Sequence, residues 1–151
     1  MKGYTLLELL VTATVLGVLI SYGVPQFQKS FEQSRVDLAG AHLESIWTAQ
    51  RLFKAQNATF AQGIGNLGDF LDASFINSAC VSSDPCGTVC DFCYRFENVT
   101  STAFTAVAQR NSGKTTFWDG SILLTEAGTL TGSTYAPRTG APVYQILPAQ
   151  F

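Results

Sequence analysis

Glu8 is the residue whose chemistry stands out first, because it is the single charge in a long apolar stretch. Between residues 4 and 24 there is no Lys, Arg or Asp and no second Glu. A carboxylate at the centre of a bilayer costs on the order of 3 kcal/mol, and less near the interface. An acid in such a segment is by default functional, so we expect Glu8 to meet a positively charged partner.

The cysteines form a second group with possible chemistry, and they are Cys80, Cys86, Cys90 and Cys93. Two structural disulfides are the favoured interpretation, because an even number of cysteines behind an export-like N-terminus is typical of an oxidising compartment. A zinc site, or a redox motif made by Cys90-x-x-Cys93, is the alternative. The spacing matches no common zinc motif, and Cys93 is expected to open a strand, which does not suit the redox motif. The sequence leaves all three disulfide pairings open.

No other group of residues predicts catalysis. His42 is the only histidine, and we interpret it as a surface or interface residue of a helix. The chain has no Ser/His/Asp set, phosphate-binding loop or paired acids at a catalytic spacing. The formal charge of -2 argues against a nucleic-acid binder driven by phosphate attraction. We therefore predict no enzymatic activity, no cofactor, no metal and no direct nucleic-acid site.

The elements that must position Glu8 form one long helix in two parts. Residues 4–24 are apolar, and 21 residues of helix reach roughly 30 Å, the thickness of a bilayer core. Residues 25–56 are amphipathic, with apolar side chains at spacings of three, four and seven. Pro25 lies between the two parts and predicts a kink or a local break. The apolar residues of the second part are Phe27, Phe31, Leu38, Leu43, Ile46, Trp47, Leu52 and Phe53.

The rest of the chain predicts a loop region and then a sheet. Residues 57–92 carry the cysteines, with a short helical turn at 67–75, and residues 93–151 form antiparallel strands and a tail. One face of such a sheet needs a cover, and the amphipathic helix is available. The fold class is therefore α+β, a long kinked N-terminal helix packed on a C-terminal antiparallel sheet. The expected strands are 93–99, 103–110, 115–124 and 129–131, with a turn at 111–114.

The segment Gly3-Tyr4-Thr5-Leu6-Leu7-Glu8-Leu9-Leu10-Val11 resembles the type III signal and N-terminal helix of type IV pilins and pseudopilins. In that family a prepilin peptidase cuts after a Gly, and the new N-terminal residue is methylated on its amine. The resemblance implies a leader of residues 1–3, cleavage after Gly3 and a methylated Tyr4. Tyr4 stands where Phe is commoner, and the leader is shorter than usual.

The resemblance also implies a structural function. The chain would lie in the inner membrane first and then polymerise with identical subunits into an extracellular type IV pilus, for adhesion, motility or DNA uptake. Glu8 would pair with the terminal amine of a neighbouring subunit. Gly17 and Pro25 bound a weak section of the helix, which we expect to melt or extend in the filament.

Two alternatives remain open at this point. A pseudopilin of a type II secretion or competence system would share the N-terminal motif. Major pseudopilins often carry a C-terminal calcium site, and residues 132–151 contain no Asp or Glu. A signal-anchored periplasmic thiol protein belongs to a different class, and it would need reduced or metal-bound cysteines and a retained Met1.

Overall fold

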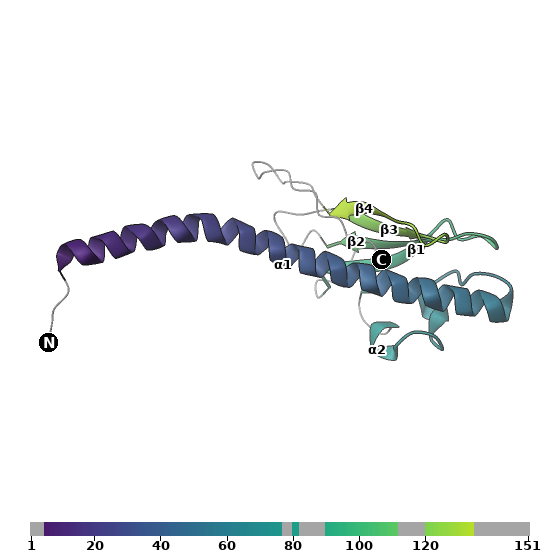
Figure 1. The fold of residues 1–151 in the computed structure, drawn as a ribbon. Coiled ribbons are helices and arrows are strands. Elements are labelled where there is room, and N and C mark those ends of the chain that lie inside the picture. The colour runs from purple at the N-terminus through teal and green to yellow at the C-terminus, as the bar shows by residue number, and fades with distance from the viewer. Residues whose placement is uncertain (1–4, 77–79, 82–89, 112–119, 135–151) are drawn as a thin grey trace. The chain divides into compact units, whose positions relative to one another are not determined.

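The computed structural model describes residues 5–76, 80–81, 90–111 and 120–134 (Figure 1). The chain divides into two compact units, Met1–Ser34 and Arg35–Phe151. The first unit consists of the beginning of one long helix. The second unit contains the remainder of that helix, a connecting region and the sheet.

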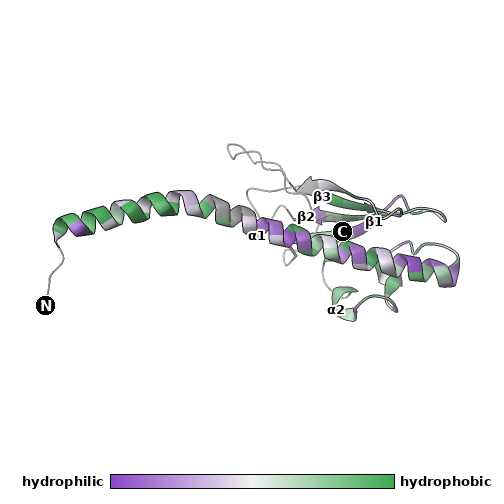
Figure 2. Ribbon diagram, in the orientation of Figure 1, coloured by the Kyte–Doolittle hydropathy of each residue, from purple (hydrophilic) through white to green (hydrophobic). Residues whose placement is uncertain are grey.

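The helix α1 runs over Leu6–Asn57, which makes it 52 residues long. Figure 2 shows that its first part is mostly apolar and its last part mixed, as the residue pattern predicts. Pro25 has no N–H to donate, so it removes one hydrogen bond from the helical ladder. The helix nevertheless continues through this position. The local break that was one of the two outcomes predicted from Pro25 is therefore absent.

The sheet has four antiparallel strands in the order β1-β2-β3-β4. Its register places Tyr94 opposite Ala108 and Ala108 opposite Ile122, so these three residues form one row across the sheet. The predicted α+β fold class is therefore confirmed. The strands are β1 (Phe92–Glu97), β2 (Thr105–Arg110), β3 (Gly120–Thr125) and β4 (Leu130–Thr134).

The core of the second unit lies between α1 and one face of the sheet (Figure 1). Val36, Leu43 and Ile46 of α1 are fully buried, at the spacings that place them on one side of a helix. Ala106 and Ile122 belong to the same cluster from the sheet side. Each fully buried aliphatic side chain contributes about 1.5–3 kcal/mol, so this face holds the second unit together.

The region between helix and sheet contains two short helices. The 3-10 helix η1 covers Ile64–Leu67, and the single turn α2 covers Ala73–Ile76. The sequence predicted one helical turn at 67–75, so η1 starts earlier and α2 later than expected. Ile64 and Leu67 are both buried, so η1 packs on the core of the second unit.

Gln50 of α1 forms hydrogen bonds with the loop that follows the helix. Its side chain is completely buried. Its Nε2 donates to the carbonyl of Ala61 at 2.8 Å, and its Oε1 accepts from the amide of Ala61 at 2.9 Å. One side chain therefore satisfies both backbone groups of a buried loop residue.

We expect Gln50→Leu to destabilise the second unit. Leu has a similar volume but leaves the N–H and C=O of Ala61 without partners, and a buried unsatisfied group costs about 1–3 kcal/mol. The expected loss in the free energy of unfolding is therefore about 2–3 kcal/mol. Urea unfolding of the full chain in detergent, followed by tryptophan fluorescence, measures it. The exposed Gln56→Leu is the matched control, and a loss no larger than that of the control would contradict this role.

Candidate functional site

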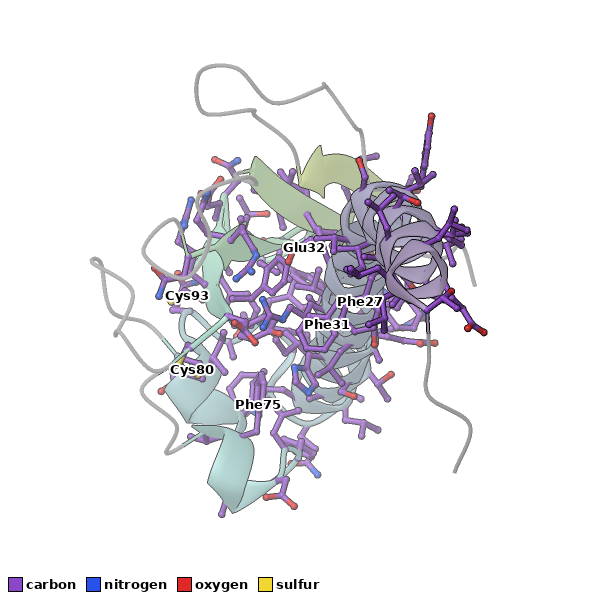
Figure 3. The ribbon with its side chains drawn as sticks, turned by 90° about the vertical axis from the view of Figure 1, so that its left-hand side faces the viewer. Phe27, Phe31, Glu32, Phe75, Cys80 and Cys93 are labelled. Atoms are coloured by element: carbon purple, nitrogen blue, oxygen red, sulfur yellow. A yellow bond between two sulfur atoms is a disulfide. The ribbon has the colours of Figure 1, made fainter. Side chains whose placement is uncertain are left out.

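The first candidate site is the apolar segment at the start of α1. Leu6–Val24 is 19 residues long, strongly apolar and entirely unburied. By length and composition it can cross a membrane. Exposed apolar surface costs roughly 25 cal/mol per Å², so lipid or protein must cover these side chains. The exposure continues at Phe27 and Phe31, whose rings stack at 6.2 Å (Figure 3).

Thr5 defines where this helix begins. Its carbonyl accepts the first helical hydrogen bond from the amide of Leu9 at 3.2 Å, and its Oγ1 accepts from the amide of Glu8 at 3.3 Å. This is the N-cap arrangement, and Thr5 with Glu8 has the spacing of a capping box. Sequence reasoning missed Thr5, although a Thr-x-x-Glu pattern before an apolar run was the available signal.

Glu8 lies in the first turn of α1 and is exposed. A carboxylate there interacts favourably with the positive end of the helix dipole. Among the residues that the structure describes, no cationic group pairs with this carboxylate. Gly3 and Tyr4 lie outside the described residues, so cleavage and methylation stay predictions.

The other two residues of the predicted assembly set also lie in α1. A Cβ built on Gly17 would meet no atom within 4 Å, so the helix presents a small open surface there. Pro25 is inside the unbroken helix. Melting or extension of this section concerns the assembled form, and it stays a prediction.

The structure gives one of the disulfide pairings that the sequence left open. Cys80 and Cys90 form a disulfide with a Cα–Cα distance of 5.5 Å. Cys93 is disulfide-bonded too, and Cys86 lies outside the described residues. Cys90 therefore pairs with Cys80 and not with Cys93, so Cys90-x-x-Cys93 is not a closed redox pair. Figure 3 shows Cys80 and Cys93 in this part of the second unit.

The disulfide holds a short segment against the edge of the sheet. The amide of Tyr94 in β1 donates to the carbonyl of Cys80 at 2.9 Å, and Val81 makes a parallel bridge with Tyr94. A disulfide that closes a loop of this size stabilises a domain by about 2–4 kcal/mol. It therefore adds a covalent link to a segment whose Cys80 and Val81 also pack against the core.

His42 contacts the sheet through an aromatic cluster that sequence reasoning did not find. Its Nδ1 lies 2.8 Å from the hydroxyl of Tyr94. The His42 ring lies 5.1 Å from the ring of Phe75 and 5.5 Å from that of Tyr94, and Phe75 and Tyr94 are 5.2 Å apart. The three residues come from α1, α2 and β1, so no local sequence pattern could connect them.

The titration of this cluster follows from its burial. Burial, with a smaller contribution from the charge of Asp91, raises the pKa of Tyr94 well above its usual value. Tyr94 is therefore protonated at neutral pH, and its hydroxyl shares one hydrogen bond with Nδ1 of His42. Burial also lowers the pKa of His42.

We expect the second unit to lose stability as the pH falls below about 6.5. Because the pKa of His42 is lower in the folded chain, the unfolded chain binds more protons in this range and is favoured by acid. Urea unfolding between pH 7.5 and 5 measures the slope. His42→Gln keeps an acceptor for Tyr94 without titrating, so its profile should be flatter. Parallel profiles would contradict this assignment.

A charged cluster lies at the start of β1. The side chain of Arg110 is fully buried, and its Nη1 donates to the carbonyl of Asp91 at 2.6 Å. The same Nη1 lies 3.6 Å from Oδ1 of Asp91, and Nε of Arg35 lies 3.7 Å from Oδ2. Two guanidinium groups thus lie close to one carboxylate.

Comparison with known proteins adds independent findings. Residues 1–22 match the family described as "Prokaryotic N-terminal methylation motif". The chain is 33% identical over 67 residues to the "Type IV major pilin protein PilA" of Myxococcus xanthus (strain DK1622). That alignment covers 42% of this chain and 30% of the relative, so the chain spans less than a third of the relative's length. No solved structure gives a significant match.

The fold and the N-terminal segment define a class, an α+β protein with an N-terminal methylation motif on an exposed apolar helix. Within that class, the chain shares the methylation motif and is homologous over 67 residues to one type IV major pilin, so the predicted resemblance is confirmed. The sequence-based interpretation of the first helix therefore agrees with the family match.

Proposed function

We propose that the chain is a structural subunit that polymerises through its N-terminal helix into a type IV pilus-like surface filament. The single observation that carries the proposal is the complete exposure of Leu6–Val24, an apolar helix that the rest of the described chain does not cover. A protein keeps such a surface only if another phase or another copy covers it. Lipid of the inner membrane would do so first, and neighbouring subunits afterwards.

The processing steps follow from the motif at the start of the chain. Cleavage after Gly3 by a prepilin peptidase would make Tyr4 the first residue, directly before the N-cap Thr5. The new amine would then lie at the positive end of the helix dipole, which is unfavourable for a cation by about 0.3–1 kcal/mol. A carboxylate from another subunit would offset that cost.

Glu8 supplies that carboxylate in the proposal. Among the described residues, Glu8 interacts with the positive end of the helix dipole and has no cationic partner. In an apolar environment an unpaired carboxylate is costly. Pairing with the amine of Tyr4 in a neighbouring subunit would desolvate both charges together. The free-energy cost of moving this helix from the membrane into the filament would be moderate, because packing between helices replaces its contacts with lipid.

The test of processing is the intact mass of the protein isolated from cells. We expect a chain that begins at Tyr4 and carries one methyl group on its amine. Cells without prepilin peptidase should contain the chain from Met1, and Gly3→Leu should do the same in cells with the enzyme. A mature chain that keeps Met1 in normal cells would contradict the proposal and favour an anchored periplasmic protein.

A further inference from the structure

Two phenylalanine rings are exposed on α1 just beyond the apolar segment (Figure 3). Phe27 is 70% exposed and Phe31 is 53% exposed, and their ring centroids lie 6.2 Å apart. Within the described part of the chain, every other Phe is buried or half-buried. The two residues are four positions apart, so they lie on the same face of the helix. They therefore form one aromatic pair that projects from the helix surface.

The aromatic pair extends beyond the length that a bilayer covers. Leu6–Val24 already has the length of the hydrocarbon core, roughly 30 Å. At 1.5 Å per residue, Phe31 follows Val24 by about 10 Å along the helix. An aromatic side chain buries about 150–250 Å² when it is covered completely. Exposed apolar surface outside the span of the membrane marks a contact with protein.

The second unit contains a groove with aromatic walls. It has a volume of about 860 Å³, within the range of pockets that hold drug-sized ligands. One wall is the face of α1 from Arg35 to Ala49, which gives the groove a length of roughly 20 Å. Phe70, Phe75 and Tyr94 contribute aromatic rings to its lining. Two phenyl rings that lie 6.2 Å apart fit along this length.

Four polar side chains in the groove already have hydrogen-bond partners. The hydroxyls of Ser45 and Thr48 donate to carbonyls of their own helix at 3.0 Å each. Nδ1 of His42 lies 2.8 Å from the hydroxyl of Tyr94. An apolar group can therefore enter without leaving any of these four polar groups unsatisfied. The exposed Leu38 adds an apolar side chain to the lining.

The charges around the groove balance. Arg35, Asp72 and Asp91 line it, and the buried Arg110 lies next to Asp91. Arg35 is 3.7 Å from Asp91, and Asp72 has an interaction of its own. Two cations and two carboxylates give a net charge of about zero at neutral pH, so the groove selects neither an anion nor a cation. A phenyl ring instead gains from edge-to-face contacts with aromatic walls, at centroid distances of about 4.5–7 Å.

We propose that Phe27 and Phe31 of one copy insert into this groove of a second copy. The inference rests on the proposed function, because it names a further contact between subunits of the filament. The aromatic pair continues the exposed apolar surface of Leu6–Val24 on the same helix. The pair and the groove are different surfaces of one chain, so each copy gives one contact and receives another. Repeated head-to-tail contacts of this kind build an open helical filament when the rotation between copies does not close.

Photo-crosslinking from position 27 tests the contact. Phe27→p-benzoylphenylalanine keeps the phenyl ring and is made in the full chain, in cells whose filaments are then irradiated and purified. We expect adducts of twice the subunit mass, in which position 27 of one copy is joined to residues 38–49 or 70–75 of the other. Tyr22→p-benzoylphenylalanine is the control position, because Tyr22 is an exposed aromatic residue within the apolar segment. It should join residues 6–24 of a neighbour and not the groove.

Two matched variants of the receiving surface are made in the chain that carries the photoreactive group. Ser45 is exposed and lines the groove, so the indole of Ser45→Trp takes the space of one ring. Cross-linking to the groove, measured per subunit in purified filaments, should fall about tenfold, as expected when a packed contact is overfilled. Ala41 is exposed on the same helix and does not line the groove, so Ala41→Trp should leave the cross-linking unchanged.

The outcomes separate this contact from the proposed function. Filaments in which position 27 joins only residues 6–24 of a neighbour, lipid or its own copy would overturn the contact and leave the filament proposal intact. Equal groove cross-linking in Ser45→Trp and Ala41→Trp would overturn it as well. If the chain forms no filaments, the proposed function fails, and the contact between subunits falls with it.

Discussion

Glu8→Ala is expected to abolish filaments while the protein still inserts into the membrane. Removing the carboxylate makes the segment more apolar, so insertion becomes more favourable. In the filament, the same change leaves the amine of a neighbouring subunit without a counter-charge in an apolar core. Removing one partner of a buried ion pair costs about 3–5 kcal/mol, and every subunit contact would carry that cost. Membrane fractionation and electron microscopy of the same cells measure both results.

Two further variants separate the charge of Glu8 from its place in the capping box. Glu8→Gln keeps a side chain that suits the N3 position of the capping box but has no charge, so we expect it to fail as Glu8→Ala does. Thr5→Ala keeps the charge and removes the cap, a loss of about 1 kcal/mol at one helix end, so filaments should form in reduced number. Normal filaments from Glu8→Gln would show that the charge is not needed.

Arg110→Ala is expected to destabilise the second unit by about 3 kcal/mol or more. The substitution deletes a fully buried side chain and leaves a cavity next to Phe92, whose ring lies 5.2 Å from the guanidinium carbon. It also removes the hydrogen bond to the carbonyl of Asp91 and one of the two cations that face its carboxylate. Urea unfolding in detergent, followed by tryptophan fluorescence, gives the loss.

Arg95→Ala is the control for this prediction, because it lies on β1 in the same sheet. Its guanidinium pairs with Glu97 at 2.8 Å, and both side chains are about 40% exposed. Exposed ion pairs contribute about 1 kcal/mol or less, so this variant should unfold almost as the wild type does. If the two variants lost the same free energy of unfolding, the burial of Arg110 would not be the reason for its contribution to stability.

The sequence predicts the helix and the sheet well, because both have periodic patterns. Leu43 and Ile46 of the predicted apolar stripe are buried. The prediction was wrong for Leu38 and Leu52, which are exposed, and it missed the buried Val36. The four strands begin or end within a few residues of their predicted bounds where the structure describes them. Pro25 predicted a kink or a local break, and the break is absent, since one missing hydrogen bond does not end a helix of this length.

The polar contacts could not be predicted in the same way. Tyr94 meets His42 across 52 positions, and Arg110 meets Asp91 across 19, so neither pair has a spacing that a sequence pattern could detect. The pairing of Cys80 with Cys90 likewise depends on where the loop returns to β1. Thr5 differs from these, because its capping role is local and was readable from Thr-x-x-Glu.

The two units differ in what their described side chains contact. Leu6–Val24 has no buried residue, and Glu8 is its one charge. The second unit is stabilised by its own core, a disulfide and the buried Arg110. Assembly variants in the first unit should therefore leave the stability of the second unit unchanged.

The most direct test of the central claim is to purify surface filaments from the cells that make this protein and to identify their subunit by intact mass. The account predicts long filaments built from a chain that begins at N-methylated Tyr4, and no filaments in cells with Glu8→Ala. Surface filaments without this chain, or a processed chain that never leaves the membrane, would contradict the claim that it is a filament subunit of the cell surface.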